Sequence, residues 1–273
     1  MKRLSLVLVC LVLISSLLLS ACGKEVVKTE APVTQEPPEA TESPVAIETT
    51  EAPLPVVRVA TDATFKPFEY TDDAGNLIGI DIDLMNMIAE KAGFQIEWSN
   101  LPFDSGLAGI SECQYDAMIA AISITDERKQ SMLFSDPYMT AGLVVVVAKD
   151  NNTINGMSDL DGLTVAAQLG TTGEQAAQAI PNVNYKPYDS YELAFLDLAN
   201  GQIDAVVADS PVAAGYVKAN PDKIKMVGDI FDSADYGVAI CKTNTDLQAK
   251  INAALKELIA AGVIDELSKK YNP

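Results

Sequence analysis

Short runs of β-branched and small apolar residues alternate with segments of helical periodicity through residues 56–273. Strands that alternate with helices favour parallel sheets, because a parallel connection needs a crossover and a helix supplies it. A second series of the same kind begins after the apolar run 142–148. The pattern predicts an α/β fold built from two units. Its first half predicts strands at 56–60, 95–98 and 116–121, and helices at 83–92 and 104–111.

The first 22 residues have the features of a secretory signal. Lys2 and Arg3 precede an apolar run at 4–19, which ends in Leu-Ser-Ala-Cys with Cys22 last. The run is shorter than the about 20 apolar residues of a spanning helix, which favours cleavage. The tetrapeptide resembles the lipobox of bacterial lipoproteins, the alternative being an ordinary buried cysteine. The resemblance implies lipid attachment at Cys22 and an extracytoplasmic protein anchored to the cell membrane.

Residues 23–55 are rich in Glu, Thr, Pro, Ala and Val, with no aromatic residue and no helical or strand period. This composition predicts a disordered acidic tether between the anchor and the folded part. A flexible chain of this length would span on the order of 30 Å.

Charge and composition exclude several classes of function. The net charge is −19, of which the signal contributes +2 and the tether −5, so residues 56–273 carry −16. A nucleic-acid partner is excluded because phosphate binding needs a basic face. The chain has no His, which excludes Ser-His-Asp and Cys-His sites and His-ligated metals. We expect no metal and no cofactor.

Five motifs carry a resemblance to a known family: Thr-Asp-Ala-Thr-Phe-Lys-Pro-Phe-Glu-Tyr at 61–70, Gly-Ile-Asp-Ile-Asp-Leu at 79–84, Ser-Ile-Thr-Asp-Glu-Arg at 123–128, Phe-Ser-Asp-Pro-Tyr at 134–138 and Gly-Thr-Thr-Gly at 170–173. In order and spacing they resemble the polar amino-acid-binding proteins of ABC transporters, the family 3 solute-binding proteins. The resemblance covers residues 56–273.

The resemblance implies a type II periplasmic-binding-protein fold with two α/β lobes joined by two hinge strands. Lobe 1 is expected at 56–141 plus 237–273, and lobe 2 at 142–236. It also implies a free amino acid held in the cleft between the lobes, closure over that ligand, and delivery to the permease subunits of an ABC importer. We expect a monomer and no enzymatic activity.

An amino acid presents a carboxylate and an ammonium, so its binder needs a bidentate cation and an anion. The resemblance gives Arg128 the carboxylate, because a guanidinium fork fits that group. Ser123 Oγ and the backbone N–H groups of Thr171 and Thr172 would complete the anion site. The alternatives are a solvated helix face for Arg128 and a plain turn for Gly-Thr-Thr-Gly.

The resemblance assigns the ammonium to Asp209, with the carbonyl of Ala121 sharing it. Asp209 follows an apolar strand predicted at 203–208, and α/β folds bind ligands at the carboxyl ends of strands. The alternative for Asp209 is a strand-end or helix-capping residue.

Phe65 and Phe103 match two aromatic residues that sandwich the ligand's side chain in relatives, whereas the alternative is core packing. Asp62 would face the end of that side chain; its alternative is a turn carboxylate. Asp81 and Asp83 are expected to cap the first helix and to be structural.

Glutamine binders of the family place a Lys and a His where this chain has Gln168 and Ala208, so glutamine fits poorly. Asp62 and Asp209 against Arg128 leave one negative charge that a zwitterion does not neutralise. A cationic side chain does neutralise it, and two aromatic faces favour a cation further. We therefore expect arginine or lysine ahead of glutamine.

Cys113 and Cys241 are the two cysteines of the folded part, and a disulfide between them is one possibility outside the cytoplasm. In the family topology the strand from Tyr236 runs antiparallel beside the strand from Asp116. The resemblance therefore implies that Cys241 lies near Cys113 and predicts a bond.

Two other functions remain open. Dehydratases acting on prephenate or arogenate resemble these binders, and their chemistry needs a carboxylic acid with a raised pKa over the leaving hydroxyl. A ligand-presenting component of a sensor is the second alternative. Sensors usually continue into a transmembrane helix and a signalling domain, whereas this sequence ends at Pro273.

Overall fold

A computed structural model describes residues 53–272 of the protein. The expected signal peptide, the lipid site Cys22 and nearly all of the expected tether lie outside the described residues. In the described part, no helix has the length and apolar character needed to cross a bilayer.

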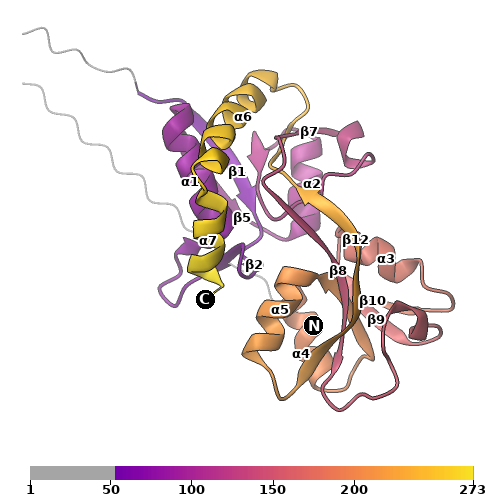
Figure 1. Ribbon diagram of the computed structural model, residues 1–273. Coiled ribbons are helices and arrows are strands. Elements are labelled where there is room, and N and C mark those ends of the chain that lie inside the picture. Colours follow the sequence, from indigo (N-terminus) through magenta and orange to yellow (C-terminus); the bar gives the residue numbers. More distant parts are fainter. Residues whose placement is uncertain (1–52, 273) are drawn as a thin grey trace, which may run out of the picture. The chain divides into compact units, whose positions relative to one another are not determined.

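The first of two five-stranded sheets is built from strands of the expected lobe 1 (Figure 1). Strand β1 is parallel to β5 and β6, whereas β13 is antiparallel to both β6 and β7. The carboxyl ends of β1 and β6 therefore meet at one edge of the sheet. In spatial order the strands are β5 (Gln95–Asn100), β1 (Val56–Thr61), β6 (Ala117–Met118), β13 (Ala239–Cys241) and β7 (Met132–Phe134).

Lobe 2 contains the second sheet. Its three parallel strands, β10, β9 and β11, continue into two antiparallel ones, β8 and β12. In spatial order these are β10 (Asn184–Tyr188), β9 (Thr164–Gln168), β11 (Ala205–Asp209), β8 (Met139–Ala148) and β12 (Ile224–Tyr236). A small antiparallel sheet of β2 (Thr64–Phe65), β3 (Glu69–Thr71) and β4 (Leu77–Ile78) lies beside the first. The two α/β lobes expected from the sequence are confirmed.

Helices cover the sheets because each has one apolar side that packs inward. In lobe 1, α1 packs against α6 and α7, and α2 contacts β1, β6 and β13. In lobe 2, α3 and α4 contact β9 and β11, whereas α5 contacts β8 and β12. The bounds are α1 (Ile80–Ala92), α2 (Phe103–Ser111), α3 (Thr172–Gln178), α4 (Tyr191–Ala199), α5 (Ser210–Ala219), α6 (Thr245–Ala260) and α7 (Val263–Tyr271), with 3-10 turns η1 (Arg128–Gln130) and η2 (Met157–Asp159).

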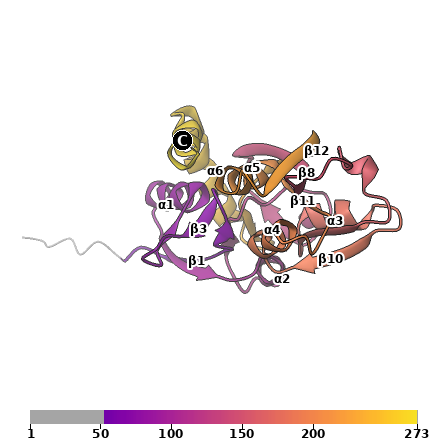
Figure 2. The same ribbon diagram turned by 90° about the horizontal axis from the view of Figure 1, so that it is seen from below.

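Strands β8 and β12 link the two lobes and lie side by side in both ribbon views (Figures 1 and 2). Their pairing runs from Ile224 opposite Ala148 to Tyr236 opposite Met139. The register shifts twice between Val227 and Ala234, and Gly228 and Asp232 in this stretch have φ of 72° and 46°. Bulges bend a strand, so this stretch is where the pair of linking strands, β8 and β12, departs most from a regular ladder.

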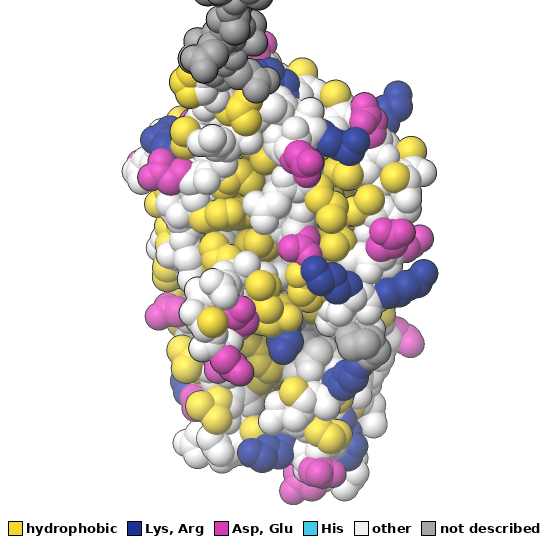
Figure 3. All heavy atoms as spheres, turned by 90° about the vertical axis from the view of Figure 1, so that its left-hand side faces the viewer, with side chains coloured by type: hydrophobic (Ala, Val, Ile, Leu, Met, Phe, Trp, Pro, Cys, Tyr) yellow, Lys and Arg dark blue, Asp and Glu magenta, His cyan; other side chains and the backbone are white. Residues whose placement is uncertain are grey.

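One face of the molecule, seen in Figure 3, has apolar side chains in its middle with acidic and basic side chains interspersed around them. Charges of both signs lie next to one another there. This face thus has no uniform basic surface of the kind that would bind nucleic acid.

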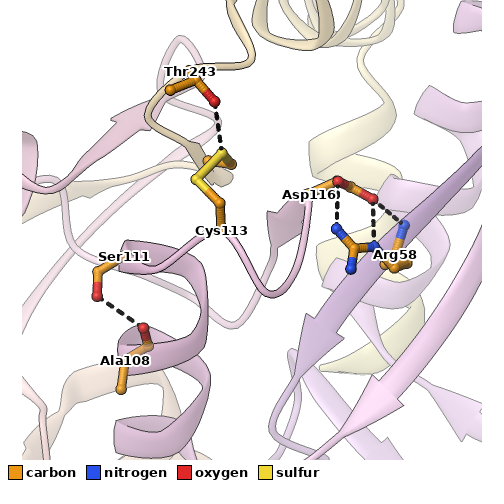
Figure 4. Close-up of a disulfide and its surroundings, with 7 residues drawn as sticks. Arg58, Ala108, Ser111, Cys113, Asp116 and Thr243 are labelled. Atoms are coloured by element: carbon orange, nitrogen blue, oxygen red, sulfur yellow. Dashed lines mark hydrogen bonds and ion pairs between the residues drawn. A yellow bond between two sulfur atoms is a disulfide. The ribbon is translucent and has the colours of Figure 1, made fainter.

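A disulfide joins Cys113, just beyond the end of α2, to Cys241, the last residue of β13 (Figure 4). It links two positions 128 residues apart in the sequence. Nearby, Asp116 accepts from Arg58 Nε at 3.0 Å and Nη2 at 2.9 Å, which fastens β1 to the start of β6.

The prediction that Asp81 and Asp83 cap the first helix is wrong. The N-cap position is Gly79, with no side-chain cap, and the helix begins at Ile80. Asp81 instead accepts bonds from Ala121 and Tyr138, and Asp83 accepts from Lys270 and Tyr271. Both carboxylates lie in the first turn, where the helix dipole favours negative charge, but their partners come from other parts of the chain.

Candidate functional site

A pocket lies between the lobes, at the carboxyl ends of the parallel strands. Its volume is about 10 Å³, close to the space that one water molecule needs. Eight of the ten predicted ligand residues line it, and the other two, Asp62 and Gln168, are hydrogen-bonded to each other. Its lining is Phe65, Phe103, Ala120, Ala121, Ser123, Arg128, Thr171, Thr172 and Asp209.

Arg128 begins η1 and reaches across the pocket. Its Nη1 donates to the carbonyl of Ser123 in lobe 1 at 2.7 Å, and its Nη2 donates to the carbonyl of Gly170 in lobe 2 at 2.9 Å. The guanidinium lies over the ring of Phe103, 5.6 Å from its centroid. Burial lowers the pKa of Arg128, opposed by the charge of Asp209. These two bonds use two of the five N–H donors of the guanidinium, and a carboxylate needs two.

The Gly-Thr-Thr-Gly segment forms the entry to α3. The Thr171 hydroxyl accepts from the backbone N–H of Glu174 at 3.1 Å and donates to the carbonyl of Gln168 at 2.7 Å. Thr171 is therefore the N-cap, and its hydroxyl is engaged within lobe 2. Thr172, the first residue of the helix, also lines the pocket.

Asp209 ends β11 and is 5% exposed. Its Oδ1 accepts from the hydroxyl of Tyr236 at 2.5 Å. Burial raises the pKa of Asp209 to about 6, while the Tyr236 bond and the charge of Arg128 act in the opposite direction. A buried carboxylate of this kind gains from a cation that enters the pocket.

Asp62 follows β1 and is 2% exposed. Its Oδ1 accepts from Thr64 Oγ1 at 2.8 Å, and its Oδ2 accepts from Gln168 Nε2 at 2.6 Å, a bond between the lobes. Burial raises the pKa of Asp62, and the hydrogen bonds from Thr64 and Gln168 lower it. Both of these hydrogen-bond partners are neutral.

Gln168 is fully buried at the end of β9, and its Nε2 also donates to the carbonyl of Asp189 at 3.0 Å. Its Oε1 is buried and accepts from no residue of the described part of the chain. An amide oxygen and a carboxylate therefore lie together next to the pocket, both as hydrogen-bond acceptors.

The two predicted aromatic residues are each 4% exposed, so both pack into the protein and both also line the pocket. The Phe65 ring lies 5.6 Å from that of Tyr191 and 6.1 Å from that of Phe68. Phe103 faces the guanidinium of Arg128. Core packing and a pocket wall are compatible roles for these side chains.

Sequence reasoning missed five residues at or around the pocket: Ala120, which lines it, and Glu69, Tyr138, Gly170 and Tyr236. Glu69 and Tyr236 are fully buried, and Tyr138 is 5% exposed. A Glu in a strand and a Tyr at a strand end carry no local signal of their partners, because those partners lie far away in the sequence. Gly170 contributes a backbone carbonyl, which the residue type does not reveal, and its φ of 78° is one that favours glycine.

In the described part of the chain, no group of three or more acidic or cysteine side chains is arranged to hold a metal ion. The donors and acceptors of the pocket lining are instead one guanidinium, one carboxylate, three hydroxyls and backbone groups, with the carboxylate of Asp62 and the amide of Gln168 beside them. This set matches the ends of a small zwitterion or cation.

The sequence profile of the bacterial extracellular solute-binding proteins, family 3, matches residues 57–273. The chain belongs to this family. The chain is 35% identical over 264 residues to a probable histidine-binding protein of Neisseria gonorrhoeae, covering 94% of this chain and 91% of the relative.

Two solved structures are also similar. An ancestral arginine-binding protein bound to arginine is 41% identical with a TM-score of 0.76, covering 80% of this chain and 98% of that protein. An ancestral amino acid-binding protein, named as a precursor of cyclohexadienyl dehydratase, is 36% identical with a TM-score of 0.74, covering 80% and 96%. Both similarities support the two-lobed fold.

Proposed function

We propose that this family 3 solute-binding protein captures a free polar amino acid, with arginine or lysine preferred over glutamine. The observation that carries the proposal is the pair of buried carboxylates, Asp62 and Asp209, opposite one guanidinium. Asp209 would take the ammonium together with the Ala121 carbonyl. Arg128 would take the carboxylate with Ser123 and the backbone N–H groups of Thr171 and Thr172.

The ligand's side chain would lie between Phe65 and Phe103 and end at Asp62 and Gln168. Asp62 has only neutral hydrogen-bond partners, so a ligand cation would supply the missing charge. The buried Oε1 of Gln168 would accept from the same cation. A guanidinium carries five donors and suits two acceptors better than one ammonium does, so arginine is the first choice.

Entry of the ligand needs opening of the cleft, because a pocket of about 10 Å³ does not hold an amino acid. Arg128 and Gln168 each bond across the cleft, so these bonds must break and re-form around the ligand. We propose that lobe 2 (142–236) swings against lobe 1 (56–141 plus 237–273) about β8 and β12. The closed, loaded form would then be delivered to the permease of an ABC importer.

We further propose that the protein is extracytoplasmic and attached through lipid on Cys22. Membership of an extracellular family supports the compartment, and the Leu-Ser-Ala-Cys sequence supports the attachment. A monomer is the form in which we expect it to act.

A dehydratase is the second candidate, favoured by the similarity to the ancestor named as a precursor of such an enzyme. The chemistry needs a protonated carboxyl group facing the substrate. Burial raises the pKa of Glu69 well above its usual range, but Glu69 lies outside the pocket lining. Asp209 does line the pocket, but its pKa of about 6 leaves it mainly ionised at neutral pH. An ionised Asp209 favours binding of an ammonium over acid catalysis. Formation of phenylpyruvate from prephenate would establish the enzyme.

The test is calorimetric titration of the purified protein with arginine, lysine, histidine, glutamine and ornithine. Arginine or lysine should bind most tightly, and Arg128→Ala and Asp209→Ala should each weaken binding at least a hundredfold, because each leaves a buried charge unpaired. Lys129→Ala is the matched control, since this neighbouring cation is 55% exposed and pairs with Asp126. Equal affinity for neutral and cationic amino acids would contradict the ligand preference. No binding of any amino acid would contradict the function.

A further inference from the structure

Two buried carboxyl groups lie behind the pocket without belonging to its lining. Glu69 in β3 and Asp81 in the first turn of α1 are both fully buried. Their electrostatic interaction is the second largest influence on the pKa of Glu69, after burial. Burying a carboxyl group costs free energy of folding unless the group is hydrogen-bonded or paired with a charge.

Asp81 Oδ2 holds two groups from different parts of the fold. It accepts from the backbone N–H of Ala121 at 2.7 Å and from the hydroxyl of Tyr138 at 2.8 Å. Ala121 has φ of 45°, a left-handed conformation that residues other than glycine rarely adopt. The same residue lines the pocket. The charge-assisted hydrogen bond that the Ala121 N–H donates to Asp81 stabilises this backbone conformation.

A hydrogen bond between the side chains of Glu69 and Asp81 is among the influences on the pKa of both groups, and such a bond needs one proton. Within residues 53–272, both oxygens of Glu69 and Oδ1 of Asp81 lack a donor from any other residue. Two carboxylates cannot bond to each other without a proton. Burial raises the pKa of Glu69 well above its usual range, and the pKa of Asp81 only to about 6. Glu69 is therefore the acid and Asp81 the ionised partner.

The second group held by Asp81 belongs to the linker between the lobes. Tyr138 directly precedes β8, and its backbone N–H donates to the carbonyl of Tyr236, the last residue of β12, at 3.0 Å. The Tyr236 hydroxyl in turn donates to Asp209. Asp81 thus contacts both a wall of the pocket and the point where the two linking strands meet lobe 1.

We propose that Asp81 is a positioning residue for the ligand, which keeps the Ala121 carbonyl turned toward the ligand's ammonium and keeps Tyr138 at the base of the hinge. Protonated Glu69 completes its hydrogen bonds. The proposal rests on the proposed function, because an amino-acid ligand is what brings an ammonium to Ala121.

The test compares arginine with 5-guanidinopentanoate, which is arginine without its α-amino group. Asp81→Asn should weaken arginine binding about tenfold to a hundredfold, the range expected for one charge-assisted hydrogen bond. It should change binding of the analogue by less than about threefold. Glu69→Gln is the matched control: the amide keeps a donor toward Asp81, so arginine affinity should stay within about threefold of the original.

A spectroscopic readout makes the test independent of ligand affinity, and the dispersion of the same spectrum shows whether each variant is folded. The amide proton of Ala121 should resonate downfield in the free protein, move upfield in Asp81→Asn, and stay in place in Glu69→Gln. Tyr138→Phe removes only the hinge contact, so it should leave the Ala121 resonance in place and change the binding of arginine and of the analogue equally, by less than about threefold.

Two results would overturn the positioning role: an Ala121 resonance that does not respond to Asp81→Asn, or an equal loss of arginine and analogue binding in that variant. If the unaltered protein binds no amino acid at all, the proposed function fails. The Ala121 resonance then still reports whether Asp81 holds this backbone.

Discussion

Replacing Asp62 with Asn should change which ligand the protein prefers. Asp62 is 2% exposed and its two side-chain partners, Thr64 and Gln168, are neutral, so a ligand cation would be its only charged partner. Removing one member of a buried ion pair costs about 3–5 kcal/mol. A net loss of about 3 kcal/mol corresponds to about a hundredfold weaker binding of arginine.

Citrulline provides the comparison, since a neutral urea replaces the guanidinium in nearly the same shape. Calorimetric titration should show that the arginine-to-citrulline affinity ratio falls about a hundredfold in Asp62→Asn, with citrulline binding unchanged or improved. Asp104→Asn is the matched control, because Asp104 is exposed and its Cα lies beside Gly170 at the pocket. The control should change the ratio by less than about threefold. A ratio in Asp62→Asn that stays within threefold of the original would refute the charge argument.

Four further predictions concern the same pocket and the disulfide. Because Asp209 has a pKa raised to about 6, and the ammonium needs its ionised form, arginine affinity should fall about tenfold from pH 7 to pH 5 in titrations at each pH. The same raised pKa means that the Asp209 contribution to the stability of the free protein is present below its unfolded pKa of 3.8 and lost as the pH rises through 6, a trend that Asp209→Asn should weaken in thermal melts. Arg128→Lys keeps the charge but loses the fork that bonds at 2.7 and 2.9 Å, so arginine affinity should drop about tenfold to a hundredfold by calorimetry. Replacing Cys113 and Cys241 together with Ala should lower the free energy of unfolding by about 2–5 kcal/mol in denaturant titrations, and no change under reducing conditions in the unaltered protein would contradict this.

Much of the fold follows from local pattern. The period of the apolar residues predicted the helix at 104–111 within one residue of α2, and the apolar strand at 203–208 placed Asp209 at a strand end. The strand predicted at 116–121 was too long, because regular pairing covers only Ala117–Met118 and Ala121 turns into a left-handed conformation. The apolar sequence does not reveal that Ala121, its last residue, has a left-handed backbone conformation and donates its N–H to the distant Asp81.

The predicted site residues come together for a topological reason. Each sheet brings the carboxyl ends of its parallel strands to one edge, and the two edges meet at the pocket. Asp62, which follows β1, and Gln168, which ends β9, therefore become neighbours across 106 positions of sequence. The pairing of Asp81 with Ala121 and Tyr138 has no such periodic signal. Asp81 looks like an N-terminal capping residue in the sequence, and only the fold shows that its oxygen points to other elements.

The disulfide closes a covalent ring around the whole of the second sheet. The chain leaves lobe 1 through β8 and returns through β12, and both crossings lie between Cys113 and Cys241. A single protease cut anywhere in residues 114–240 would therefore leave one covalently connected molecule rather than two fragments. The disulfide also joins the segment before β8 to the segment after β12, so both segments are held at the sheet of lobe 1. The proposed opening and closing of the lobes would then be absorbed within β8 and β12.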